Sequence, residues 1–309
     1  MDRLSSGSAI ELPAGDAVFL DHLAHWVGDI GAAAAMLERL GFQATPYAEH
    51  THSTATGEAP VPAGSANHCV MLACGYLEVL TPIGDTPIAR EVRAALERYT
   101  GVHLAAFCTE NTPAHRERLD SQGFAQRPCV TLTRESSDAE GRPCTLRFTV
   151  ARPEVGCLAE GRVQFLTHHT PDELWQPRWM EHANGARALT DMLFCVEDAE
   201  EARARYSRYL DREPRSIEGG CVFSLDRGRL ALLTAEAIAD TLPGSAIPRT
   251  PCMSAYAIES IDLARTREAL RNGSIEFLEA TQGSIIVPPT PALGGTIVFT
   301  APDTPPPWL

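Results

Sequence analysis

A pattern of residues occurs twice in the first half of this 309-residue chain, and it limits the folds that the chain can adopt. Each copy opens with an apolar segment that contains a histidine, His22 in the first copy and His103 in the second. A helix-like stretch follows and stops at a Gly-Phe pair, 19 residues after His22 and 20 residues after His103. Each copy closes with a short apolar strand that carries one polar residue, Glu78 or Gln164. An internal repeat of this kind predicts two copies of one structural unit.

Local patterns predict the elements of each unit. Apolar residues alternate from Val18 onwards as in a strand, and alanines and leucines at helical spacing predict a helix over 30–40. Residues 51–64 are polar, contain Gly and Pro, and are expected to form a loop before a strand pair over 67–80. A third copy of the pattern starts near Leu189, and a weaker fourth copy starts near residue 253. We therefore expect four similar modules.

The modules and the segments between them divide the chain into five parts. The segment between the second and third modules is rich in Trp, His and Pro, so we expect an ordered connection and not a flexible linker. The predicted parts are a leader (1–17), a first domain (18–170), a connector (171–187), a second domain (188–302) and a tail (303–309).

Composition excludes several functions. A formal net charge of −14 argues against nucleic acid or an anionic membrane as a partner. No run of apolar residues is long enough to span a bilayer, and no apolar signal core follows Met1, so we expect a cytoplasmic protein. The nine cysteines show no Cys-x-x-Cys spacing and are expected to be reduced. All 26 basic residues are arginine, so Schiff-base chemistry on lysine is excluded, while arginine can still hold a carboxylate or phosphate.

The segments that carry the repeat resemble a known superfamily. Leu20-Asp21-His22 opens the first module, Tyr76-Leu77-Glu78-Val79-Leu80 closes it, and 64–68 followed by Gly75 completes the likeness. The sequence resembles the vicinal oxygen chelate superfamily, and in particular its glyoxalase-like domain proteins. That resemblance implies an α+β fold in which four βαβββ modules pair into two domains, each with a cup-shaped mixed sheet.

The resemblance also implies a metal site, because superfamily members take metal ligands from the first and last strands of two paired modules. The corresponding residues are His22, Glu78, His103 and Gln164. Gln164 stands where glyoxalases usually have glutamate, and a neutral amide is a poorer ligand. In the third and fourth modules the equivalent residues are Asp191, Ala231, Ser254 and Ile297, which form no complete ligand set.

The residues support the same site without the resemblance. On the closing strands, Glu78 and Gln164 lie on the face opposite their apolar neighbours, and His103 opposes Val102 and Leu104. Burying two imidazoles and a carboxylate costs several kcal/mol unless a partner compensates, and a divalent cation (Fe, Mn, Zn or Ni) is a suitable partner. The alternative is that His22 and His103 are hydrogen-bonded core residues and that Glu78 pairs with an arginine.

Three further residues are candidates for substrate binding. His68 lies on a predicted strand of the first module and could orient substrate or act with Glu78 as an acid or base, or it could be a surface residue. Arg147 could bind an anionic group or form a surface salt bridge. His168 shares strand parity with Gln164 and could replace a missing ligand, or it could cap a turn.

These residues leave three functions open, each with a small molecule as partner and with a homodimer as a possible assembly. The first is a glyoxalase-like lyase or isomerase that binds vicinal oxygens of its substrate through a divalent metal. The second is an Fe(II)-dependent extradiol-type dioxygenase, since two histidines and a carboxylate suit that metal. The third is a metal-free binding or resistance protein that uses the same cup.

Overall fold

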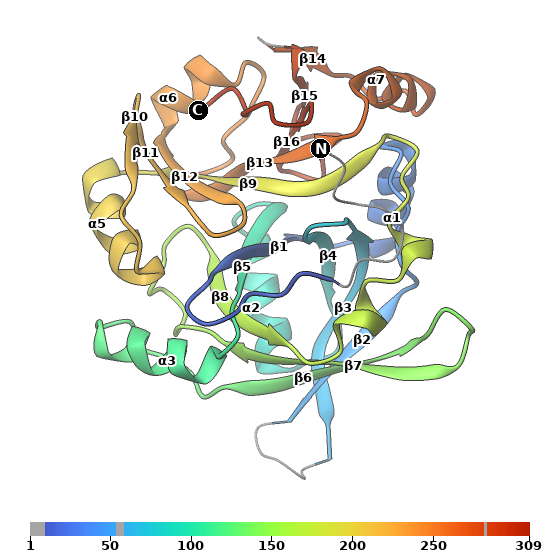
Figure 1. Ribbon diagram of the computed structural model, residues 1–309, viewed down its shortest axis with the longest axis vertical. Coiled ribbons are helices and arrows are strands. Elements are labelled where there is room, and N and C mark those ends of the chain that lie inside the picture. Colours follow the sequence, from blue (N-terminus) through green and yellow to red (C-terminus); the bar gives the residue numbers. More distant parts are fainter. Residues whose placement is uncertain (1–9, 54–58, 281–282) are drawn as a thin grey trace.

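The computed structural model describes residues 10–53, 59–280 and 283–309. Within this part of the chain the strands form two mixed eight-stranded sheets, one from the first two modules and one from the last two (Figure 1). This arrangement confirms the predicted fold class. None of the described helices is long and apolar enough to cross a lipid bilayer.

The first sheet closes into a barrel, with strand order β1-β4-β3-β2-β6-β7-β8-β5. Its elements, in chain order, are β1 (Phe19–Trp26), α1 (Ile30–Arg39), β2 (Ala48–Ser53), β3 (Val61–Met71), β4 (Tyr76–Pro82), α2 (Pro87–Leu96), β5 (Gly101–Cys108), α3 (Thr112–Ser121), β6 (Val130–Ser137), β7 (Pro143–Ala151) and β8 (Arg162–His168).

A short helix, α4 (Pro171–Leu174), and a 3₁₀ turn, η1 (Pro177–Trp179), connect the barrel to the second sheet. The second sheet is open, with order β10-β11-β12-β9-β13-β16-β15-β14. Its elements are β9 (Ala186–Val196), α5 (Ala199–Leu210), β10 (Arg215–Ile217), β11 (Gly220–Ser224), β12 (Arg229–Thr234), α6 (Ala235–Thr241), β13 (Cys252–Ser260), α7 (Leu263–Asn272), β14 (Leu278–Glu279), β15 (Ile285–Val287) and β16 (Thr296–Thr300).

Each pair of modules joins through its first strands. β1 pairs antiparallel with β5, and β9 pairs antiparallel with β13. Within each module the first strand pairs in parallel with the last, as β1 does with β4 and β5 does with β8. The strands that open and close a module therefore lie side by side.

The two sheets share one hydrophobic core. The largest buried cluster joins Leu23 of β1, Phe107 of β5, Phe194 of β9 and Tyr256 of β13, and helices α1, α3, α5 and α7 contribute to its margins. In Figure 1, β9 and β13 lie next to β1 and β5, and contacts join β13 to β5 and β9 to β1. Because this packing covers the outer side of β1 and β5, the inner side of the barrel remains available for a site.

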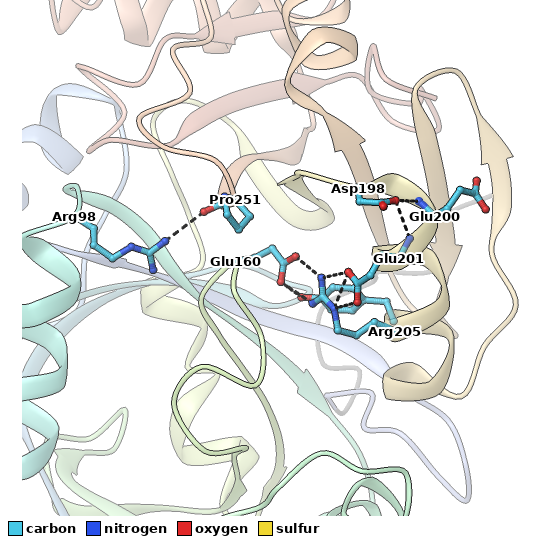
Figure 2. Close-up of polar contacts among 8 residues, drawn as sticks. Arg98, Glu160, Asp198, Glu200, Glu201, Arg205 and Pro251 are labelled. Carbon is cyan, nitrogen blue, oxygen red and sulfur yellow. Dashed lines mark hydrogen bonds and ion pairs between the residues drawn. The ribbon is translucent and has the colours of Figure 1, made fainter.

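A buried polar contact also joins the barrel to the second sheet. Glu160, in the loop before β8, is 1% exposed and accepts hydrogen bonds from Arg205 Nη1 and Nη2 of α5, each at 2.9 Å (Figure 2). The hydroxyl of Tyr206 donates a third bond to the same carboxylate at 2.9 Å. Figure 2 also shows that Arg205 binds Glu201 of its own helix.

The predicted loop over 51–64 is wrong at both ends. Residues up to Ser53 belong to β2 and residues from Val61 belong to β3, while 54–58 lie outside the described residues. Residues 49–53 of β2 are all polar, and the strand bridges the two modules by pairing with β3 on one side and with β6 on the other.

Candidate functional site

The interior of the barrel contains a cavity that both modules line. His22 of β1, Glu78 of β4 and Gln164 of β8 all face it, as predicted from the repeat. Leu104 of β5 and Leu166 of β8 supply apolar wall. We call this space the barrel cavity. Three of the four predicted ligand positions therefore face one space.

A buried network holds His22 in place. The register of β1 against β5 shifts between Leu20 and His22, so Asp21 is an extra residue beside His22. The Asp21 carboxylate accepts a hydrogen bond from His22 Nδ1 at 2.7 Å and another from His168 Nε2 at 2.9 Å. A proton on Nδ1 leaves the lone pair of His22 Nε2 free, which is the arrangement that metal-binding histidines commonly have. The His22 ring also stacks on Tyr76, with ring centroids 4.3 Å apart.

Glu78 is the only carboxylate among the described residues that line the barrel cavity. It is 7% exposed and accepts a hydrogen bond from the Asn67 amide, whose oxygen in turn accepts from Arg134 at 2.8 Å. His50 Nε2 of β2 lies 3.7 Å from Glu78 Oε1. Burial is the largest cause of the lowered pKa of His50, about 4, and it outweighs the opposing effect of Glu78. The His50 imidazole is therefore neutral and can be a metal ligand.

His103 does not belong to this group, so the prediction that it shares a site with His22 and Glu78 is wrong. Its ring stacks on Tyr99 at 3.9 Å and on Trp26 at 5.1 Å, and its Nε2 bonds to the Tyr99 carbonyl at 2.8 Å. It lines a separate pocket beside α2 and the loop before β8, which we call the outer pocket. The alternative of a hydrogen-bonded core histidine describes it correctly.

The physical reason is an offset of one residue. Glu78 pairs with Ala24 and Gln164 pairs with Ala106, so the residue equivalent to His22 is Leu104. Successive side chains on a strand point to opposite faces, so a shift of one residue moves His103 out of the barrel. The sequence carried this signal, because Leu104 stands 19 residues before Gly123, the spacing that separates His22 from its own Gly-Phe pair.

The three predicted substrate-binding residues do not line the barrel cavity. His68 lies between the inward-facing Asn67 and Cys69, and its Nδ1 bonds to the Thr45 carbonyl at 2.7 Å on the outer side. Arg147 is exposed on the outer face of β7. His168 is buried against Asp21 and supports His22. His68 and Arg147 point away from the cavity because side chains alternate along a strand. His168 instead contacts the carboxylate of Asp21, the additional residue of β1.

Several residues that line the barrel cavity were not predicted to take part in the site. They are His50, Tyr76 and three arginines, namely Arg134, Arg152 and Arg162. His50 alternates with His52 in the sequence and could have been recognised as a strand residue. The arginines have no common motif, and only the closure of the barrel brings them together.

The polar side chains of the barrel cavity are of the chemical types that bind divalent cations. Two imidazoles, a carboxylate and an amide are ordinary ligands of Fe, Mn, Zn or Ni, and the His50–Glu78 separation is within the roughly 3–4.5 Å expected between two ligands of one ion. Among the described residues, one group of three such side chains already has its ligand atoms within 4.8 Å of one another, and it is Asp21, Cys108 and His168. His22, His50 and Glu78 are more widely spaced, so binding one ion to all three requires their side chains to close around it.

In the described part of the second sheet, side chains pack over the face that corresponds to the barrel interior. Ile238 and Leu242 of the α6 segment and Trp308 of the C-terminal segment pack against it. Asp191, equivalent to the opening histidine, is fully buried and binds Arg229 through both carboxylate oxygens. Of the equivalent positions in the second sheet, Asp191 therefore forms an ion pair, and Ala231 and Ile297 belong to hydrophobic clusters.

A family model described as "Glyoxalase-like domain" matches residues 20–210, more than half of the chain. The chain belongs to this glyoxalase-like family. The match includes the whole barrel of the glyoxalase-like protein together with β9 and α5. No curated protein matches its sequence.

Solved structures show the same fold at low sequence identity. A hypothetical protein from Staphylococcus aureus superposes with a TM-score of 0.60 at 9% identity, covering 92% of this chain and 99% of that one. A variant of 4-hydroxymandelate synthase from Streptomyces coelicolor gives 0.56 at 13% identity, with 92% of each chain covered. A Mn(II)-bound glyoxalase from Novosphingobium aromaticivorans gives 0.53 at 12% identity, covering 92% of this chain and 82% of that one. The glyoxalase-like protein is thus a member of the vicinal oxygen chelate superfamily.

Proposed function

We propose that the barrel cavity is the active site of a divalent-metal-dependent enzyme that acts on a small molecule through two neighbouring oxygens, with lyase or isomerase chemistry. The observation that carries this proposal is the presence of His22, Glu78 and Gln164 in one cavity, with His22 held by a buried carboxylate. That two superfamily members of similar fold are a Mn(II)-bound glyoxalase and a 4-hydroxymandelate synthase variant is consistent with it.

His22 Nε2, His50 Nε2 and Glu78 are the proposed ligands, and Gln164 is a candidate fourth. A bound divalent cation would polarise the substrate oxygens and stabilise negative charge on them. Asp21 keeps the His22 imidazole oriented, and Asn67 holds one Glu78 oxygen. Because Glu78 is the one carboxylate that lines the described cavity, it is also the candidate for accepting a proton from the carbon beside a substrate carbonyl.

Elemental analysis of purified protein tests the ligand set. We expect about one bound metal per chain in the wild type, and its loss in His22→Ala and in His50→Ala. The matched control is His103→Gln, which changes a buried histidine outside the barrel and is expected to retain the metal. Loss of metal in His103→Gln with retention in His50→Ala would contradict this ligand set.

The same preparation separates the two other functions. Bound Fe(II) with turnover that consumes dioxygen would favour an extradiol-type dioxygenase, because His22, His50 and Glu78 form a two-histidine, one-carboxylate set. Absence of any metal after supplementation, with ligand binding unchanged in His22→Ala, would favour a metal-free binding protein.

A further inference from the structure

The two modules supply different chemistry to the barrel cavity. The first module contributes the metal-type donors His22, His50 and Glu78, whereas the second contributes positive charge. The charged residues are Arg134 of β6, Arg152 directly after β7 and Arg162 at the start of β8. Among the described lining residues, these three guanidinium groups face one carboxylate, that of Glu78.

Two of the three arginines have partners. Arg134 donates to the Asn67 side-chain oxygen at 2.8 Å and contacts Cys69 Sγ at 3.3 Å. Arg162 donates to Glu91 Oε2 at 3.0 Å, and its guanidinium lies 4.8 Å from the centre of the Trp26 ring. Both side chains are therefore fixed in position and satisfied in part by the protein itself.

Arg152 is different. It is 7% exposed, yet among the described residues its guanidinium has no hydrogen-bond acceptor and no ion-pair partner. The nearby carboxylate of Glu91 is already shared by Arg127 at 2.8 Å and Arg162 at 3.0 Å. Burial, and then the charges of Arg162 and Arg127, lower the pKa of Arg152. A buried, unpaired guanidinium is costly, and an anion would compensate it.

We infer that the substrate carries a carboxylate or phosphate group, and that Arg152, with Arg162 beside it, binds this group at the second-module side of the barrel cavity. Arg152 and Arg162 line both the barrel cavity and the outer pocket, so the rest of a substrate whose oxyanion binds between these two guanidinium groups can extend into the barrel. A planar guanidinium matches either oxyanion with two parallel hydrogen bonds. This inference rests on the proposed function only in taking the cavity as the active site.

Calorimetric titration of protein treated with EDTA tests the anion site without any metal. The probes are malonate, inorganic phosphate and malonamide, the last being the uncharged analogue of malonate. We expect wild-type protein to bind malonate or phosphate and not malonamide, and the stronger of the two anions identifies the group. Arg152→Gln is expected to weaken that binding about 10-fold or more, the usual effect of losing a charge-assisted hydrogen bond.

Arg142→Gln is the matched control, because Arg142 is exposed and pairs with Asp138 and Glu140 on a surface turn. It should bind the anion as the wild type does. Arg152→Met is a second variant, expected to fold because it removes an unpaired buried charge, and it should also lose the anion. Absence of anion binding by the wild type, or unchanged binding in either folded Arg152 variant, overturns the inference. Metal content and anion binding are measured separately, so either proposal can fail without the other.

Discussion

Replacing Asp21 by asparagine tests the network that orients His22. Asp21 is 1% exposed, and its carboxylate is the common acceptor for His22 Nδ1 at 2.7 Å and His168 Nε2 at 2.9 Å. Burial raises the pKa of Asp21, but the charges and hydrogen bonds of His168 and His22 lower it by more, so it lies well below its ordinary value. The carboxylate is therefore ionised in the folded protein at neutral pH.

The expected cost follows from the number of bonds. An amide offers one oxygen and no charge, so Asp21→Asn can accept at most one of the two hydrogen bonds, and its NH₂ group faces the other imidazole N–H. A hydrogen bond to a charged group contributes about 1.5–3 kcal/mol, and the surviving bond is weakened too, so the free energy of unfolding should fall by about 2–4 kcal/mol. Metal affinity should fall about 10- to 100-fold, as is usual when the partner of a metal-binding histidine is removed.

The acid dependence of stability should change as well. A carboxyl group whose pKa is lower in the folded than in the unfolded state stabilises the fold above the unfolded pKa of about 4, and this contribution disappears as the pH falls toward the folded value. The wild type should therefore lose more stability than Asp21→Asn on acidification below about pH 4.

Urea unfolding and metal titration measure these effects, and Asp191→Asn provides the control. Asp191 is a similarly buried aspartate on β9 of the second sheet, bonded to Arg229. This control should lose stability but keep its metal affinity. A destabilisation of Asp21→Asn below about 1 kcal/mol, or equal metal affinities in the two variants, would refute the reasoning.

Three other predictions address packing, register and pH. Arg205→Ala should lower the free energy of unfolding by about 3 kcal/mol, because the buried Glu160 carboxylate keeps only the hydrogen bond from the Tyr206 hydroxyl among the described contacts. Glu201→Ala should change the free energy of unfolding by less than about 1 kcal/mol. Equal urea midpoints of the two variants would contradict this. Leu104→His should tighten metal binding in a titration, because it restores an imidazole at the position equivalent to His22; no gain would argue against the register. Burial is the main cause that lowers the pKa of His103 to about 4, so the neutral imidazole contributes fully to stability above about pH 6.5 and this contribution is lost as the pH falls. Between about pH 7.5 and 5 the free energy of unfolding of the wild type should therefore fall by about 2 kcal/mol more than that of His103→Gln. Parallel pH profiles of the two proteins would exclude this.

Much of the fold was predictable because the sequence repeats. The opening strands, the helices that end at Gly-Phe and the closing strands all have local patterns of alternation and helical spacing. β2 was missed because its residues are polar, and a strand between two other strands inside a barrel need not show a clear apolar face. Glu78 and Gln164 were placed correctly in the barrel cavity because their apolar neighbours fix which face turns inward.

The sequence alone determined the repeated modules, the polar residue of each closing strand and the lack of a ligand set in the last two modules, because each of these depends on neighbouring residues. Tertiary structure decided the content of the site. The registers of β4 on β1 and of β8 on β5 put Leu104, and not His103, at the position equivalent to His22, since a strand changes face at every residue. Closure of the barrel brought His50 to Glu78 and left Arg152 unpaired among the described residues, because contacts between distant segments exist only once the sheet is complete.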